Sequence, residues 1–427
     1  MQTIFALATA RGKSGVAIMR ISGPAAHDVG RLLAGSLPLA GRSALRALRD
    51  RHGEFLDQAL VLSFESPRSF TGEDVVELQI HGSVAVIRAL EVAIAETGLA
   101  RMAEPGEFTR RALLNGHLDL AQVEGLADLI AAETELQRKQ AQQLFSGGMR
   151  VFADQCRTDL VRAIALVEAT IDFADEDVPV DVAPEVGLLL ENVLRDVRRQ
   201  LAGYGHAERV RNGFEVAVIG PPNAGKSTFI NKIAGRDIAI TSDIPGTTRD
   251  VLEVRVDLAG LPVTFLDTAG LRDSADKIER LGVARARSRA LEADVRILLI
   301  DGLTDDGGFD ASMPVDLIYR TKADLTGVGI SARTGDGIDA VLADVERILS
   351  DRVSGMTIAS HERHRLALDR ADVLLQSAIT VFRGGDVGAE ILAVHLRDVV
   401  TTLDSLIGRV DVEAVLGEIF SEFCIGK

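Results

Sequence analysis

A phosphate-binding motif near the middle of the chain constrains the fold more than any other feature. Residues 219–227 read IGPPNAGKS and match the pattern G-x-x-x-x-G-K-S. A strand-like stretch (Phe214–Ile219) precedes the motif and a helix-like stretch (Thr228–Ala234) follows it, which is the context that the motif requires. In such a loop, backbone N–H groups surround phosphate oxygens, Lys226 reaches the β- and γ-phosphates, and the Ser227 hydroxyl binds Mg²⁺. The chain is therefore predicted to bind a nucleoside triphosphate.

Changes in the apolar pattern divide the sequence into four segments. Residues 1–117 mix short strands with a helical stretch, which predicts an α+β domain. Residues 118–212 carry apolar side chains at helical spacing and predict the first part of an all-α helical domain. Residues 213–355 alternate strands and helices, so the phosphate motif belongs to a P-loop α/β domain. Because residues 356–427 are helical again, the α/β domain is predicted to be inserted into the helical domain.

Overall charge and cysteine content limit the possible partners and compartments. The net charge of −16 argues against a simple polyanion binder, so any contact with nucleic acid needs a local basic patch or a basic partner. Cys156 and Cys424 form no disulfide framework and no metal-ligand spacing, which fits a reducing compartment. No secretory signal and no membrane span is recognisable, and we expect a cytoplasmic, bacterial location.

Three further polar segments follow predicted strands of the α/β domain. Thr247 and Thr248 lie on a loop, where a threonine hydroxyl can complete Mg²⁺ coordination and sense the γ-phosphate. Asp267 ends a strand and starts the run DTAG, in which Gly270 can donate its N–H to the γ-phosphate. Asp324, in the run TKAD, can accept from the paired N–H donors that guanine offers and adenine lacks. The order and spacing of these segments predict a GTPase rather than an ATPase or a kinase.

Two positions depart from the usual GTPase pattern. Thr321 stands where such enzymes carry asparagine in N-K-x-D, so weaker loop tethering and weaker guanine affinity are expected. GTP preference is expected to persist through Asp324. Leu271 follows Gly270, so no glutamine stands there to orient the attacking water, and the sequence designates no arginine finger. Another group must therefore position the water and neutralise the transition-state charge.

The residues predicted from these motifs to surround the nucleotide form four groups along the chain. They are Asn223, Ala224, Gly225, Lys226, Ser227 and Thr228, then Thr247 and Thr248, then Asp267, Thr268, Ala269 and Gly270, and finally Thr321, Lys322, Ala323 and Asp324 with Ser331, Ala332 and Arg333 closing over the base.

Several long motifs resemble those of one family along nearly the whole chain. They include ALATA and SGVAIMRISG near the N-terminus, SFTGEDVVELQIHGS at Ser69–Ser83 and EPGEFTRRALLNGHLDLAQVE at Glu104–Glu124. The run TSDIPGTTRDV and the terminal FCIGK at Phe423–Lys427 complete the set. In these motifs the chain resembles the family of tRNA modification GTPases called MnmE or TrmE.

The resemblance implies a potassium ion that supplies the charge of an arginine finger. Motif positions assign K⁺ to Asn223, Ser242, Ile244 and Thr247, and Mg²⁺ to Ser227 and Thr248. The potassium loop as a whole comprises Ser242, Asp243, Ile244, Pro245, Gly246 and Thr247. Catalysis is assigned to Lys226 and to Glu279, and Glu279 would orient the attacking water. From the residues alone, Asn223 is an ordinary loop residue and Glu279 is a solvated acid at a helix start. Two G domains of a homodimer are expected to face each other across these sites, so hydrolysis accelerates on dimerisation.

The resemblance also implies that the N-terminal domain dimerises and binds a 5-formyl- or methylene-tetrahydrofolate donor. Arg20, Glu77 and the terminal Lys427 match ligand-contacting positions, and His117 stands where many relatives carry lysine. A guanidinium suits the glutamyl carboxylate of a folate, and a carboxylate suits the donor edge of a pterin. As sequence features alone, these residues are surface charges.

A partner and a further candidate catalytic residue follow from the same resemblance. The implied partner is an FAD-containing protein of the MnmG family, in a heterotetramer that acts on the C5 atom of the wobble uridine (U34) of certain tRNAs to give aminomethyl or carboxymethylaminomethyl uridine. FAD enters only through that partner. Cys424 is a candidate catalytic residue because the family's tail enters the modification site, and a reduced structural cysteine is the other interpretation.

Two rival functions remain open at the level of sequence. One is a non-catalytic GTPase switch in ribosome assembly or signalling, with the N-terminal domain as a docking surface. The other is an ATP-dependent kinase, which Asp324 and the DTAG strand end disfavour. Folate binding and hypomodified wobble uridine on deletion would separate the first rival from the modification enzyme.

Overall fold

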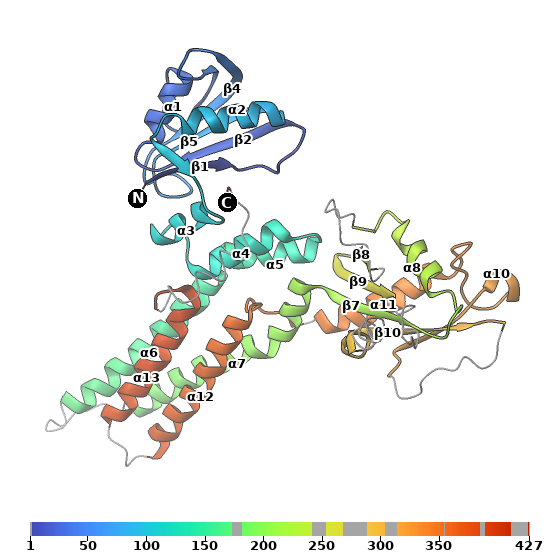
Figure 1. Cartoon of the computed structure of the whole chain (residues 1–427). Coiled ribbons are helices and arrows are strands. Elements are labelled where there is room, and N and C mark those ends of the chain that lie inside the picture. The colour runs from blue at the N-terminus through green and yellow to red at the C-terminus, as the bar shows by residue number, and fades with distance from the viewer. Residues whose placement is uncertain are drawn as a thin grey trace, which may run out of the picture. The chain divides into compact units, whose positions relative to one another are not determined.

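The computed structural model describes residues 2–172, 182–240, 253–267, 288–303, 314–353, 355–384, 389–410 and 426. Contacts divide the chain into two compact units, one of residues 1–127 with 404–427 and one of residues 128–403. Figure 1 labels most of their elements. None of the helices in the described ranges combines the length and the apolar character that a membrane span requires.

The first unit contains a six-stranded sheet in the order β3-β4-β5-β2-β1-β6. Its strands are β1 (Thr3–Leu7), β2 (Ser14–Ser22), β3 (Ser43–Arg49), β4 (Phe55–Phe64), β5 (Val75–Gly82) and β6 (Ala100–Met102). Neighbours are antiparallel except β1 and β6, which are parallel. Helices α1 (Ala26–Ala34) and α2 (Val84–Ala95) contribute to the same apolar core as β2, β4 and β5, so both cover one face of the sheet.

Strand alternation decides which side chains of this sheet remain available to a ligand. Met19 and Ile21 of β2 are fully buried in the core beneath the helices. Arg20, between them, therefore projects from the opposite face, as does Glu77, its directly paired neighbour on β5. After the sheet come α3 (Glu107–Leu114) and α4 (Leu120–Ala131), which lead out of this unit.

The second unit contains a five-stranded sheet in the order β11-β10-β7-β9-β8. Its strands are β7 (Phe214–Ile219), β8 (Glu253–Leu258), β9 (Leu261–Asp267), β10 (Val295–Asp301) and β11 (Leu317–Thr321). All pairings are parallel except the β8–β9 hairpin. Helices α8 (Lys226–Ala234) and α11 (Ile338–Val353) pack into the larger core of the sheet, and the short α10 (Ala323–Thr326) follows β11. This is a P-loop α/β sheet.

Long helices form the rest of the second unit. They are α5 (Glu135–Phe145), α6 (Gly148–Asp172), α7 (Ala183–Asn212), α12 (Glu362–Gly384) and α13 (Ala389–Asp404). The 3₁₀ turn at Ser405–Ile407 that follows α13 belongs to the first unit. Helix α7 buries Val186, Leu190, Val193 and Val197, whose spacing of four and three residues keeps them on one stripe. Helix α7 packs against both α6 and α12. The predicted combination of an α+β domain, a helical domain and a P-loop α/β domain is confirmed.

The two ends of the α/β segment meet on one carboxylate. Asp128, in α4, accepts hydrogen bonds from Arg211 Nε and from His361 Nε2, both at 2.9 Å. Arg211 lies at the end of α7 directly before β7, and His361 lies directly before α12. Burial alone would raise the pKa of Asp128, but the contacts with His361 and Arg211 lower it. The α/β segment therefore leaves and re-enters the helices at neighbouring points, as an inserted domain requires.

Candidate functional site

The phosphate loop connects the central strand β7 to helix α8. Gly220 has a φ of +144°, and a Cβ at this position would lie 2.2 Å from the carbonyl oxygen of Leu299, so only glycine fits. Gly225, with a φ of +91°, is the N-cap residue of α8 and turns the chain into the helix. The loop therefore aims the N-terminus of α8 at the space beyond the strand ends, where an anion is stabilised.

Lys226 lies across this loop. Its Nζ donates to the carbonyl oxygens of Gly220 and Pro221, each at 2.8 Å, and the residue is 6% exposed. Within the loop, Asn223 adopts a φ of +63° and is exposed, Ala224 is buried, and Ser227 is half-buried at the start of α8. Thr228, the next residue of the helix, is exposed.

Asp267 lies beside the start of this loop. It ends β9 and pairs with Val218 of β7, two residues before Gly220. Asp267 is buried, with only 7% of its surface exposed. Loops at the carboxyl ends of parallel strands form the usual ligand-binding edge of such a sheet, and Asp267 lies at this edge beside the phosphate loop.

Thr321 connects the end of β11 to the phosphate loop. Its hydroxyl lies 2.8 Å from the carbonyl oxygen of Ala224 and 3.2 Å from that of Ile300, and the residue is 3% exposed. The hydroxyl has one proton to donate, and the shorter contact, with Ala224, connects β11 to the phosphate loop. The tethering that the replacement of asparagine was expected to weaken is present, and what Thr321 lacks is the second polar group of an amide.

Two residues after Thr321 contact the carboxylate of Asp324. Ser331 Oγ donates to Asp324 Oδ1 at 2.8 Å, and Arg333 lies 4.0 Å from Oδ2. Lys322, with a φ of +62°, forms an ion pair with Asp301 at the end of β10. The hydrogen bond from Lys322 and another from the Leu303 N–H lower the pKa of Asp301. Ala323 begins α10 and Ala332 is half-buried beside Ser331, so this whole predicted group lies at the same strand-end edge as the phosphate loop.

Several predicted residues lie outside the described part of the chain. They are Ser242, Asp243, Ile244, Pro245, Gly246, Thr247, Thr248, Thr268, Ala269, Gly270, Glu279, Cys424 and Lys427.

A second candidate site lies on the face of the first unit's sheet that is opposite to α1 and α2. A cavity of about 630 Å³ is lined by Arg20, Glu77 and His117, the three described residues that the family motifs assign to a folate. Sequence reasoning missed the remaining lining residues, which are Phe64, Pro67, Arg68, Ser69, Phe70 and Val75. Most of these belong to the segment between β4 and β5, and the signal in the sequence was Ser69 and Phe70, which open one of the family motifs directly after Arg68. The cavity combines apolar walls with a few charged groups, as ligand sites generally do.

Within the cavity, the two predicted charges contact each other. Arg20 Nε donates to Glu77 Oε1 at 2.8 Å. The Arg20 guanidinium also lies over the rings of Phe70 and Phe108, at 5.6 and 5.7 Å from their centroids. The two ends of an extended folate are much farther apart than these two groups, so Arg20 and Glu77 cannot serve opposite ends of one ligand.

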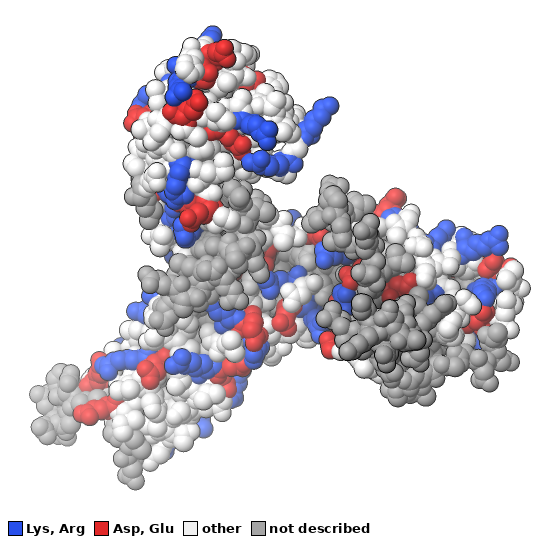
Figure 2. Space-filling view, in the orientation of Figure 1, with Lys and Arg blue, Asp and Glu red and all other residues white. Residues whose placement is uncertain are grey.

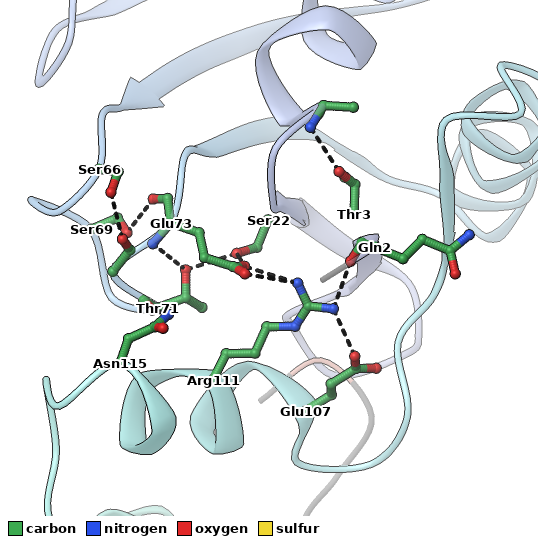
Figure 3. A network of polar contacts seen from close by, with 12 residues as sticks. Gln2, Thr3, Ser22, Ser66, Ser69, Thr71, Glu73, Glu107, Arg111 and Asn115 are labelled. Atoms are coloured by element: carbon green, nitrogen blue, oxygen red, sulfur yellow. Dashed lines mark hydrogen bonds and ion pairs between the residues drawn. The ribbon is translucent and has the colours of Figure 1, made fainter.

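A buried ionic network connects α3 to the segment that precedes β5. Figure 3 shows Arg111 of α3 donating to Glu73, to Glu107 and to the carbonyl oxygen of Gln2. Arg111 and the Glu107 side chain are each 3% exposed. Burial alone would raise the pKa of Glu107, but hydrogen bonds from Arg101, the Glu104 N–H and Arg111 lower it to about 2. Glu107 is therefore ionised in the folded protein throughout the physiological pH range.

Two family models match the chain. One is described as "GTP-binding protein TrmE N-terminus" and matches residues 3–117, and the other as "MnmE helical domain" and matches residues 120–424.

Curated relatives match the chain along its whole length. The "tRNA modification GTPase MnmE" of Jannaschia sp. is 59% identical over 430 residues, and that of Roseobacter denitrificans is 54% identical over 435 residues. Each alignment covers 100% of both chains. Among solved structures, Aquifex aeolicus Era bound to GDP·AlF₄⁻ is 26% identical over 32% of this chain and 56% of that chain, with a TM-score of 0.25.

Proposed function

The chain belongs to the MnmE family of tRNA modification GTPases, and from this premise we propose how its sites divide the reaction. It binds and hydrolyses GTP in tRNA modification. We propose that it acts on C5 of the wobble uridine with a tetrahydrofolate one-carbon donor, together with an FAD-containing partner of the MnmG family. The observation that carries the proposal is the cavity of the first unit, which gathers Arg20, Glu77 and His117.

The four sequence segments take separate tasks in this scheme. Residues 1–117 bind the folate and form the homodimer, and residues 213–355 form the G domain. Residues 118–212 and 356–427 form the helical domain, and its C-terminal tail brings Cys424 and Lys427 to the modification site. Attachment of both ends of the inserted segment to Asp128 supports transmission of G-domain movement into the helices.

Nucleotide chemistry takes place at the edge formed by the ends of β7, β9 and β11. Lys226 binds the β- and γ-phosphates, and Ser227 and Thr248 hold Mg²⁺. Asn223, Ser242, Ile244 and Thr247 hold K⁺, whose charge stabilises the transition state. Glu279 orients the attacking water. Asp324, oriented by Ser331, selects guanine.

The flavin partner supplies much of the tRNA-binding surface. Basic and acidic side chains are interspersed over the face of the protein in Figure 2, and several exposed arginines are paired, for example Arg162 with Glu185 at 2.8 Å and Arg397 with Glu168. Paired charges attract phosphates less than free ones, and the net charge of −16 repels a polyanion.

Two measurements on the full-length protein test this division of tasks. GTP hydrolysis is expected to be faster in potassium than in sodium buffer, and 5-formyl-tetrahydrofolate is expected to bind in calorimetry. Identical rates in the two salts contradict the potassium site, and absence of folate binding contradicts the assignment of the first unit. A GTPase that fails both tests and whose deletion leaves wobble uridine unchanged is better described as a switch.

A further inference from the structure

The folate cavity contains a second arginine that no family motif assigned. We propose that Arg68, and not Arg20, binds the carboxylate tail of the folate, while the Arg20–Glu77 pair receives the pterin end. This inference rests on the proposed folate function of the cavity and names the residue that selects an acidic ligand.

Arg20 is already engaged within the protein. It donates to Glu77 at 2.8 Å, its side chain is 23% exposed, and its guanidinium lies over two aromatic rings. Moving it to a ligand carboxylate would leave Glu77, whose side chain is 16% exposed, without its cation. Arg20 therefore acts on the ligand through Glu77. Its Nε donates to Oε1 of Glu77, and Oε2 of the same carboxylate can accept a hydrogen bond from the N–H edge of a pterin.

Arg68, in contrast to Arg20, is an exposed residue. It lines the cavity and forms no ion pair with any carboxylate among the described residues. An arginine presents a planar fork that matches a carboxylate through two parallel hydrogen bonds. The guanidinium of Arg68 is thus the cavity group best suited to an incoming anion.

The segment that carries Arg68 is held in place by hydrogen bonds on both sides of it. Ser66 donates through its N–H to Asp74 at 2.9 Å and through its hydroxyl to the carbonyl oxygen of Gly72 at 2.8 Å. Ser69 Oγ donates to the carbonyl oxygen of Glu73 at 2.6 Å. The Glu73 carboxylate in turn accepts a hydrogen bond from the Arg111 guanidinium (Figure 3). The backbone at Arg68 is therefore ordered before a ligand arrives, which lowers the entropic cost of binding.

The test compares two ligands and three variants of the full-length protein by calorimetry. The ligands are 5-formyl-tetrahydrofolate and 5-formyl-tetrahydropteroate, which lacks the glutamyl tail. The variants are Arg68→Gln, Arg20→Gln and the matched control Arg42→Gln, which removes an exposed arginine of the same unit that does not line the cavity. Far-ultraviolet circular dichroism checks that each variant is folded.

The wild type is expected to bind the tailed ligand about tenfold more tightly than the tail-less one, because of one charge-assisted contact. Arg68→Gln should abolish this difference and leave the tail-less ligand unaffected. Arg20→Gln should weaken both ligands by a similar factor, and Arg42→Gln should weaken neither. Unchanged preference for the tailed ligand in Arg68→Gln overturns the inference while the folate site stands. A wild type that binds neither ligand overturns the folate site itself, and with it the role of Arg68.

Discussion

The hydroxyl of Thr321 lies 2.8 Å from the carbonyl oxygen of Ala224, so the segment that we propose recognises guanine contacts the phosphate loop directly. The two residues are 97 positions apart in the chain. Through this contact, the position of Asp324, three residues after Thr321, depends on the conformation of the loop that holds the phosphates. We therefore expect recognition of the base and recognition of the phosphates to be structurally coupled.

Replacing Thr321 with valine tests this coupling, because valine keeps the shape and removes the hydroxyl. The buried carbonyl of Ala224 then loses its partner, and local opening of the phosphate loop should become easier by about 1 kcal/mol. We expect faster hydrogen exchange of the loop amides and several-fold weaker binding of a fluorescent GTP analogue. The control is Thr380→Val, which removes an exposed hydroxyl bonded within its own helix. Equal exchange and affinity in the two variants would show that the contact is unimportant.

Asp324 should determine the choice between guanine and adenine. Asp324→Ala is expected to lower GTP affinity by at least tenfold and to leave ATP affinity unchanged, because only guanine donates to the carboxylate. Ser331→Ala, which removes the hydrogen bond that orients Asp324, should lower GTP affinity by a smaller factor. Competitive titration with GTP and ATP measures both effects. A wild type that binds the two nucleotides equally contradicts this assignment.

We expect the side chain of Asn223 to be required for the stimulation of GTP hydrolysis by potassium. Its φ of +63° strains most residues, so Asn223→Gly is the variant that removes the side chain without straining the backbone. We expect this variant to hydrolyse GTP at the same low rate in potassium and in sodium buffer, with nucleotide affinity retained. The wild type measured in parallel is the control. Full potassium stimulation in Asn223→Gly would exclude the side chain as a ligand.

Glu107 should make the first unit sensitive to acid. Its pKa in the folded protein is about 2, compared with an ordinary value of 4.5. The folded pKa is the lower one, so the ionised group stabilises the protein above pH 4.5, and this contribution is lost as the pH falls from 4.5 towards 2. Hydrogen exchange of peptides from β1 and α3 in the full chain should show opening that becomes easier over this interval, by roughly 2 kcal/mol.

The variant Glu107→Gln separates this carboxylate from other acid effects. It should open more easily at pH 7, because Arg111 loses one of its buried partners, and it should lose most of the added pH dependence below 4.5. Glu104→Gln, which changes a glutamate with a 62% exposed side chain, is the matched control. If Glu107→Gln follows the wild-type pH profile, the acid sensitivity has another source.

Local patterns in the sequence predicted the elements around the phosphate loop well. The expected strand Phe214–Ile219 is β7, and the expected helix at Thr228 is α8, which starts earlier at Lys226 because the loop itself winds into the first turn. Strand β3 was not predicted, since its arginines and alanines give a weak alternation on an exposed edge of the sheet.

Side-chain contacts between residues far apart in the sequence could not be predicted from local patterns. Arg20 and Glu77 each looked like a separate ligand contact, and only the pairing of β2 with β5 shows that they bind each other. The role of Arg111 is similar, because its partners Gln2 and Glu73 come from segments far from α3. Such contacts depend on sheet order, which periodicity does not specify.

The most direct test of the account is mass spectrometry of the wobble uridine in tRNA from a deletion strain. Complementation with the wild-type chain should restore the C5 modification, and complementation with Lys226→Ala should not, since hydrolysis requires the phosphate-binding lysine. Equal restoration by Lys226→Ala, or unmodified uridine with the wild-type chain, would contradict the claim that GTP hydrolysis here drives one-carbon chemistry on tRNA.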